Sequence, residues 1–335
     1  MSDQQQGVSP AFASAFQTYQ KCISAIEKKI VERFTGRAIP ISQEDYEMLP
    51  LRMEKVFRSL ILEKTLTKAF EWMFESRETS NWTYDLRENS KAHLASLIAH
   101  IGNVPIHTVE QYFAEIQNDL EFSEHIRTIS VTKRNNGNPT DPVPRFGRRL
   151  GWYALARICK PKVIIETGLD KGLGSVTLAA ALRRNVSEGY PGHYYGLDIH
   201  KNTGFLLSGA YAPYGTIVIQ DSVEFLKTFK EQIDLLILDG CHLPEHEENE
   251  LALAEPRLTP SSIIISDTSQ SPILDFAKRT NREFQLFIEK SQDYWHPGVG
   301  NTIAFPCRTR REGFEHHREV PRGVQSCCSS NSQKM

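Results

Sequence analysis

Residues 162–184 read KVIIETGLDKGLGSVTLAAALRR, an apolar run followed by a glycine-rich turn and a helical pattern. The run KVIIETG lacks alternation between polar and apolar residues, which is typical of a strand buried on both faces of a parallel sheet. The glycines in the turn allow the backbone to approach a ligand closely, and the following helix presents unpaired N–H groups at its start. The stretch therefore predicts a strand, a ligand-binding turn and a helix in direct succession.

The same alternation repeats four more times toward the C-terminus. The expected strands are HYYGLDI, TIVIQ, DLLILDG and SSIIISD, each followed by a loop or a helical segment. Five such units in sequence predict a doubly wound α/β layer. Two more strands, REFQLFIEK and NTIAFP, leave no room for a helix between them, so we expect an antiparallel hairpin at one edge. The predicted sheet has seven strands, mostly parallel, and its last strand is antiparallel.

The N-terminal part of the chain has a helical pattern instead. Apolar residues at steps of three and four predict an all-helical domain over residues 1–130. Residues 131–147 are dense in Asn, Pro and Gly, so we expect a loop or linker there. The α/β domain would occupy residues 148–307, and the polar, Ser-rich residues 308–335 are expected to form a disordered tail.

Composition and net charge indicate which kinds of binding partner to expect. The 335 residues include 39 Lys+Arg against 41 Asp+Glu, a net charge of −2. Near-neutrality gives no general attraction to phosphate backbones, so we expect no nucleic-acid partner. No apolar run approaches the roughly 20 residues that span a bilayer, and the polar N-terminus lacks the pattern of a signal peptide. Six cysteines without zinc-ligand spacing predict a cytoplasmic protein with free thiols and no membrane partner.

Carboxylates follow the second and third predicted strands. Asp198 ends the run HYYGLD, where its carboxylate can accept hydrogen bonds from both hydroxyls of a ribose. Asp221 and Ser222 open the helix after the third strand, which is typical of a helix N-cap. Asp221 can also accept a hydrogen bond from an adenine amino group. The two interpretations of Asp221 are compatible, and both stay open.

Two further carboxylates, Asp239 and Asp267, follow the fourth and fifth strands, where ligands of open α/β sheets bind. They could hold Mg²⁺ or another hard cation, or one of them could position a substrate hydroxyl. His242 has a pKa range suited to accept a proton, although a capping or surface histidine is the alternative. We interpret the acidic residues that follow as a solvated helix start: Glu245, Glu247 and Glu248.

Four stretches in order, ETGLDKGLGSVTLAAAL, YYGLDIH, QDSVEFL and DLLILDGCH…SSIIISD, resemble the class I S-adenosylmethionine-dependent methyltransferases. The closing strand pair adds to the resemblance, because a dehydrogenase of the Rossmann type would continue with parallel units. The DG-x-H pattern after the fourth strand is most similar to the small-molecule O-methyltransferase branch. The resemblance spans about Arg148 to Phe305, roughly half the chain, and implies a Rossmann-like fold for this part.

The resemblance also implies S-adenosylmethionine as the cofactor and a set of residues around it. It places Glu166, Gly168 and Gly172 at the methionine part, Asp198 at the ribose, and Asp221 with Ser222 at the adenine. Metal-dependent relatives use an Asp after strand four and an Asp-Asn pair after strand five. This chain has Asp239 and Asp267, but Thr268 stands where the Asn would be, so a divalent cation such as Mg²⁺ is left open.

The reaction implied is in-line transfer of a methyl group to a hydroxyl oxygen of a small molecule, such as a natural product, phenol or sugar. Alignment of the reacting atoms supplies much of the rate in such reactions. His242 with Asp239 would remove the acceptor proton, or a cation held by Asp239 and Asp267 would stabilise the charge.

Segments outside the methyltransferase motifs are expected to meet the acceptor. The N-terminal helices could close over it or form a homodimer. The side chains that could wall its pocket are Tyr294, Trp295 and His296. Arg145, Arg148 and Arg149 hint at an acidic acceptor, with surface salt bridges as the favoured explanation.

Two other classes of function stay open at this stage. A nicotinamide-dependent oxidoreductase would need a dinucleotide to fit the G-x-x-x-G-x-G turn, which departs from the usual G-x-G-x-x-G pattern. A catalytically silent cofactor-binding module could act as a scaffold through its helices. The full set of strand-end acids argues mildly against that module.

Overall fold

The structure is a computed structural model that describes most of the chain from residue 83 to residue 307. The described residues are 76–78, 83–133, 140–267, 271–292 and 300–307, together with Lys21, Ser24, Lys28 and Trp72. The chain divides into two compact units, residues 1–64 and 65–335, and every element described below belongs to the second.

Several sequence predictions concern residues outside the described part. They are most of the helical pattern before residue 83, residues 134–139 of the loop 131–147, Thr268, the stretch from Tyr294 to His296, and the tail 308–335. The proposed domain boundaries therefore stay predictions.

Strands and helices alternate after residue 149 as the sequence pattern predicts. The helices are α4 (Glu88–Gly102), α5 (Ile106–Gln117), α6 (Leu120–Lys133), α7 (Arg149–Cys159), α8 (Leu173–Ser187), α9 (Ser222–Thr228), α10 (Pro244–Ala254) and α11 (Ser271–Arg279). The strands are β1 (Val163–Thr167), β2 (His193–Asp198), β3 (Gly215–Ile219), β4 (Ile233–Leu238), β5 (Leu258–Ser266), β6 (Arg282–Phe287) and β7 (Asn301–Pro306). Two 3₁₀ turns, η2 (Gly209–Tyr214) and η3 (Glu255–Arg257), precede β3 and β5.

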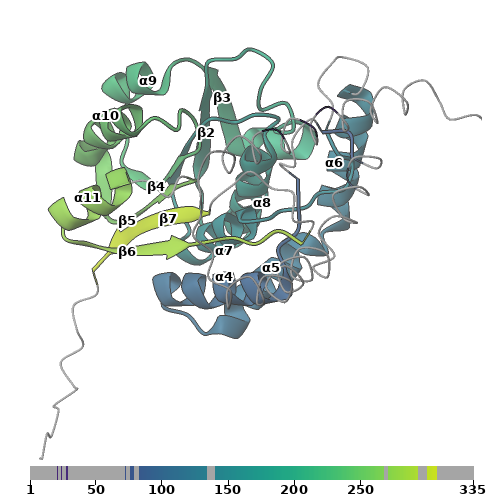
Figure 1. Cartoon of the computed structure of the whole chain (residues 1–335), viewed down its shortest axis with the longest axis horizontal. Coiled ribbons are helices and arrows are strands. Elements are labelled where there is room, and N and C mark those ends of the chain that lie inside the picture. Colours follow the sequence, from purple (N-terminus) through teal and green to yellow (C-terminus); the bar gives the residue numbers. More distant parts are fainter. Residues whose placement is uncertain are drawn as a thin grey trace, which may run out of the picture. The chain divides into compact units, whose positions relative to one another are not determined.

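The seven strands form one sheet in the order β3-β2-β1-β4-β5-β7-β6 (Figure 1). Strand β1 lies in the middle and pairs in parallel with β2 and β4, so its carboxyl end lies beside both of theirs. Strand β7 inserts between β5 and β6 and runs antiparallel to both. The predicted doubly wound, mostly parallel sheet with an antiparallel last strand is confirmed.

Helices cover both faces of the sheet because successive strand residues point to opposite sides. Ile164 of β1 packs in a cluster with α4, α5, α7 and α8, whereas its neighbour Ile165 packs with α9, α10 and α11. Figure 1 shows the two groups of helices on opposite faces. All five residues of β1 are buried, as the absence of polar alternation predicts.

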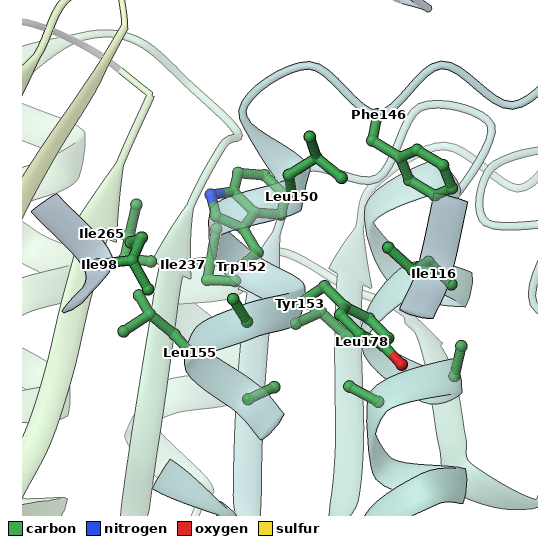
Figure 2. Close-up of a cluster of buried hydrophobic side chains, with 14 of the residues drawn as sticks. Ile98, Ile116, Phe146, Leu150, Trp152, Tyr153, Leu155, Leu178, Ile237 and Ile265 are labelled. Carbon is green, nitrogen blue, oxygen red and sulfur yellow. The ribbon is translucent and has the colours of Figure 1, made fainter. Parts of the chain in front are cut away.

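The larger cluster joins the helices before β1 to the sheet. Ile98 of α4, Ile116 of α5 and Trp152 of α7 belong to this cluster together with Tyr153 of α7 and Ile237 of β4 (Figure 2). These side chains are almost fully buried, so α4 and α5 are part of the core that supports the sheet. Among the helices that the structure describes, none is both long enough and apolar enough for a membrane crossing.

Candidate functional site

A cavity of about 590 Å³ lies at the carboxyl ends of the central strands. Ligands of open α/β sheets bind at this edge, in the crevice where the strand order reverses. Here the order reverses between β1 and β4, and residues that follow β1, β2, β4 and β5 all line the cavity. The predicted site residues that line it are Glu166, Gly168, Asp198, Asp221, Ser222, Asp239, His242 and Asp267.

Gly168 allows β1 to turn tightly against the end of β4. Its φ of 77° lies in the left-handed region, which glycine adopts without steric cost. A Cβ at this position would lie 2.1 Å from the carbonyl oxygen of Asp239. The amide of Asp239 donates to the carbonyl of Thr167 at 2.8 Å, so the two strand ends are also tied by a hydrogen bond. This close approach places the turn and Asp239 at one cavity.

Gly172 is the predicted site residue that the structure does not bring to the cavity wall. It is the N-cap of α8, with φ of 91°, and a Cβ there would lie 2.8 Å from the Cα of Gly204. The residue is therefore required for close backbone packing, and its assignment to the cofactor stays a prediction.

Asp198 is fixed at the end of β2 by two backbone amides. Its Oδ2 accepts from Leu169 at 3.0 Å and its Oδ1 accepts from His200 at 2.8 Å. An ionised carboxylate has about four acceptor positions, so each oxygen keeps one for a ligand. The side chain is thus oriented before any ligand arrives.

Asp221 and Ser222 begin α9 as the sequence predicts. Asp221 Oδ1 accepts from the amide of Glu224 at 3.1 Å, which confirms the N-cap. Ser222 is buried, and its Oγ lies 3.2 Å from Nε2 of His246 on α10. Both residues also line the cavity, so the cap leaves the adenine interpretation of Asp221 open.

Glu166 is a buried carboxyl that lines the cavity. Its side chain accepts from the hydroxyl of Tyr194 at 2.5 Å, and the same hydroxyl lies 2.8 Å from Ser175 Oγ. Burial raises the pKa of Glu166 to about 7, although hydrogen bonds from Tyr194 and Ser175 oppose the rise. The carboxyl therefore changes its charge near neutral pH.

We expect the stability of the protein to fall as the pH rises from about 5 to about 7.5, partly because of Glu166. The unfolded chain releases this proton near pH 4.5, whereas the folded state keeps it to about 7. The difference corresponds to roughly 3 kcal/mol of unfolding free energy that is lost over that range. Glu166→Gln should remove this part of the slope in urea unfolding measured at several pH values.

Glu231→Gln is the matched control for this measurement. Glu231 also accepts from a tyrosine hydroxyl, Tyr195 at 2.8 Å, but at the surface. Its variant should keep the wild-type slope. An unchanged slope in Glu166→Gln would show that Glu166 is ionised throughout the range.

Asp239 and Asp267 lie together around the guanidinium of Arg148. The Nη2 of Arg148 lies 3.0 Å and 3.3 Å from the two carboxylate oxygens of Asp239 and 3.4 Å from Oδ2 of Asp267. Burial raises the pKa of Asp239, and the nearby charge of Asp267 raises it further, against the effect of Arg148. Although burial opposes it, the neighbouring His242 and Asp239 and the charge of Arg148 hold the pKa of Asp267 below its usual range. The pKa of Asp267 is therefore the lower of the two.

His242 is paired with Asp267 at the mouth of the cavity. Its Nδ1 lies 3.0 Å from Asp267 Oδ1, and its side chain is 55% exposed. The carboxylate of Asp267 beside the ring raises the pKa of His242, although partial burial opposes the rise. A carboxylate on Nδ1 favours the tautomer whose Nε2 is free to take a proton. The pair has the composition of a general base with its orienting group.

Two interpretations drawn from the sequence are wrong. Arg148 is only 3% exposed in its side chain, so it makes no surface salt bridge, whereas Arg145 does lie near Asp85 at 3.9 Å, half-exposed. Glu247 is buried on α10, so only Glu245 and Glu248 belong to a solvated helix start. Glu247 shares one face of α10 with Leu251, four residues later, and both side chains are buried.

Sequence reasoning also missed the residues that surround the acids. Arg148 Nη1 lies 3.2 Å from Glu289, which follows β6, and Glu289 accepts from the hydroxyl of Tyr84 at 2.5 Å. The signal available in the sequence was an excess of acids at one edge, since buried charges are almost always paired. An excess of buried acids predicts a neighbouring cation, but the sequence pattern does not identify which residue supplies it.

The donor set does not fit a divalent cation at Asp239 and Asp267. Among the described residues, no group of three or more His, Cys, Asp or Glu side chains is arranged to hold a metal ion. The guanidinium of Arg148 already lies against both carboxylates, and its charge would repel a second cation. The cation at these two acids is therefore the guanidinium of Arg148.

A family model described as a methyltransferase domain matches residues 165–268. These residues run from β1 to the end of β5 and include every predicted site residue. The chain therefore contains a stretch similar to a methyltransferase domain, and this stretch forms the parallel part of the mixed seven-stranded sheet described above. None of the curated protein sequences matches the chain significantly.

Solved structures of methyltransferases are similar to part of the chain. A provisionally assigned O-methyltransferase from Klebsiella pneumoniae is 15% identical, over 59% of this chain and 99% of that one, with a TM-score of 0.44. The O-methyltransferase TomG from Streptomyces achromogenes, in complex with SAM, is 13% identical, over 55% and 90%, with a TM-score of 0.40. An O-methyltransferase from Bacillus cereus in complex with SAH is 15% identical, over 59% and 97%, with a TM-score of 0.39.

Proposed function

We propose that the protein binds S-adenosylmethionine in the cavity and transfers its methyl group to a hydroxyl oxygen of a small molecule. The observation that carries this proposal is the common cavity, onto which the strand-end acids and the His242–Asp267 pair both open. A volume of about 590 Å³ lies within the range of small-molecule sites, about 300–1,000 Å³.

The acids suit the polar groups of the cofactor. Asp198 would accept from the ribose hydroxyls, because its two backbone amides leave acceptor positions on both oxygens. Asp221 and Ser222 would lie at the adenine, next to the start of α9. Glu166 and Gly168 would lie at the methionine part, where β1 turns into α8.

His242 would act as the general base. When bound, the cofactor supplies a methyl group attached to a positively charged sulfur, and the sulfur is the group that leaves when an oxygen attacks the methyl carbon in line. A hydroxyl is a weak nucleophile until its proton is removed, and Nε2 of His242 would take that proton. Asp267 would hold Nδ1–H and stabilise the imidazolium that forms. Asp239 would keep Asp267 and Arg148 in place through its buried carboxyl.

The acceptor would be a phenol, a sugar or a related natural product, in line with the DG-x-H pattern after β4. The N-terminal helices would cover it or join two copies of the chain. The role of these helices is inferred from their position before the stretch that resembles a methyltransferase, and residues 1–75 lie mostly outside the described part.

Calorimetry with S-adenosylmethionine, S-adenosylhomocysteine and NAD tests the cofactor. We expect both sulfur compounds to bind at one site and NAD not to bind. Asp198→Ala should weaken S-adenosylhomocysteine about 10²-fold, since two hydrogen bonds to a charged group contribute roughly 1.5–3 kcal/mol each and water replaces part of them.

Asp234→Ala is the matched control. Asp234 also accepts from two backbone amides, of Lys162 at 2.8 Å and Val163 at 3.1 Å, but at the amino end of β1. The affinity of Asp234→Ala for S-adenosylhomocysteine should stay near that of the wild type. Tight binding of NAD without binding of the sulfur compounds would reverse the assignment in favour of an oxidoreductase.

A further inference from the structure

We propose that Arg148 is a built-in cation of the catalytic site, which takes the place of a divalent metal between Asp239 and Asp267. The proposal rests on the proposed function, because it concerns how the same site holds its charges. Arg148 is a positioning residue here: it acts through the two carboxylates, one of which orients His242.

One nitrogen of Arg148 contacts the carboxylates of both Asp239 and Asp267. Nη2 lies 3.0 Å and 3.3 Å from the two oxygens of Asp239 and 3.4 Å from Oδ2 of Asp267. A metal that bridged the two acids would have to occupy the same space, with oxygen ligands at about 2.0–2.1 Å for Mg²⁺. The guanidinium therefore fills the position that the two acids offer to a cation.

The other side of the guanidinium is anchored as well. Nη1 lies 3.2 Å from Oε1 of Glu289, whose side chain is 1% exposed, and Glu289 Oε2 accepts from the hydroxyl of Tyr84 at 2.5 Å. The ring of Trp152 lies 5.7 Å from the guanidinium carbon. Arg148 cannot move aside without leaving buried carboxylates uncompensated, which is strongly destabilising. The cation is thus a fixed part of the fold.

The two carboxylate oxygens of Asp267 face different partners. Oδ2 faces Arg148 at 3.4 Å, and Oδ1 faces His242 Nδ1 at 3.0 Å. By holding one oxygen, Arg148 turns the other toward the histidine. Arginine suits this task because its planar fork contacts several acceptors at once, whereas the ammonium group of lysine is a single point of charge.

Electron paramagnetic resonance of Mn²⁺ tests the proposal without any need for an acceptor. The wild-type protein, freed of metals with chelator, is mixed with equimolar Mn²⁺, and the spectrum of the aqueous ion is recorded. We expect the wild type to leave the signal undiminished. We expect Arg148→Ala to bind Mn²⁺ at the two exposed carboxylates, at least tenfold more tightly than the wild type, and Asp239→Asn in the same variant to abolish that binding.

Arg148→Lys keeps the positive charge but removes the planar guanidinium group, so it tests the two properties separately. It should exclude Mn²⁺ as the wild type does, since its charge remains, but methyl transfer should be only partly retained. If Arg148→Ala does not fold, the wild type and Arg148→Lys still decide the question. Stoichiometric Mn²⁺ binding by the wild type that Asp239→Asn abolishes would overturn the proposal.

The outcome is independent of the cofactor assignment. Failure of the calorimetry with S-adenosylmethionine would remove the proposed function, while the Mn²⁺ spectrum would still report whether Arg148 fills the cation position. Conversely, a wild type that binds both the cofactor and stoichiometric Mn²⁺ at Asp239 would keep the function and refute the built-in cation.

Discussion

His242→Ala is expected to lower kcat for methyl transfer about 10²–10⁴-fold, the usual contribution of a general base. The affinity for S-adenosylhomocysteine should change little, because the acids proposed for the cofactor follow β1, β2 and β3, whereas His242 follows β4. The measurement is steady-state methyl transfer with an acceptor found by screening phenols and sugars, beside calorimetry on the same preparation.

The pH dependence of kcat tests whether His242 acts as a base. A base must be unprotonated, so kcat should rise with pH through the pKa of His242, which the neighbouring carboxylate of Asp267 raises above its ordinary 6.5. Asp267→Asn removes the carboxylate, so the rising limb should move to lower pH. The plateau should also fall, because the imidazole loses the group that fixes its tautomer.

His193→Ala is the control for His242. His193 lies at the start of β2, at the opposite end of the strand from the cavity, and contacts Thr216 at 2.8 Å. Its rate and pH profile should match the wild type. A His242→Ala variant that keeps the full rate, or a wild-type rate that does not depend on pH between about 5 and 8, would contradict the role of His242 as a base.

Most of the fold follows from local patterns in the sequence. The apolar runs that form β1 to β5 lack strict polar alternation, and the short link after β6 requires an antiparallel neighbour, so the existence and direction of each strand can be predicted from its own stretch of sequence. The insertion of β7 between β5 and β6 is not encoded in any local period. It depends on which strand edge is available once five parallel strands have formed.

The site follows from the same logic only in part. Parallel strands end at one edge, so acids such as Asp198, Asp239 and Asp267 converge on one cavity without any further information. Arg148 precedes β1 by an entire helix, and its side chain reaches the acids because α7 packs beside the sheet. A contact of this kind depends on tertiary packing, and no spacing in the sequence reports it.

Gly168→Ala is expected to destabilise the protein by roughly 2–5 kcal/mol, the sum of a left-handed backbone and an overlap in a packed region. The new Cβ would lie 2.1 Å from the carbonyl oxygen of Asp239 and 2.5 Å from the Cα of Gly240, which are both backbone atoms that cannot rotate away. The end of β4 must therefore move away from the turn after β1. Urea unfolding measures the loss, which should appear as a lower midpoint at an unchanged m value.

Gly189→Ala isolates the backbone part of this effect. Gly189 has a φ of 88°, close to that of Gly168, but a Cβ there would meet no atom within 4 Å. We expect a loss of about 1 kcal/mol, so the difference between the two variants measures the contact between β1 and β4. The part of Gly168→Ala that remains folded should also bind S-adenosylhomocysteine more weakly, because the displaced turn and Asp239 line the same cavity. Equal losses in the two variants would mean that β4 adapts freely, and that the cavity does not depend on this close approach.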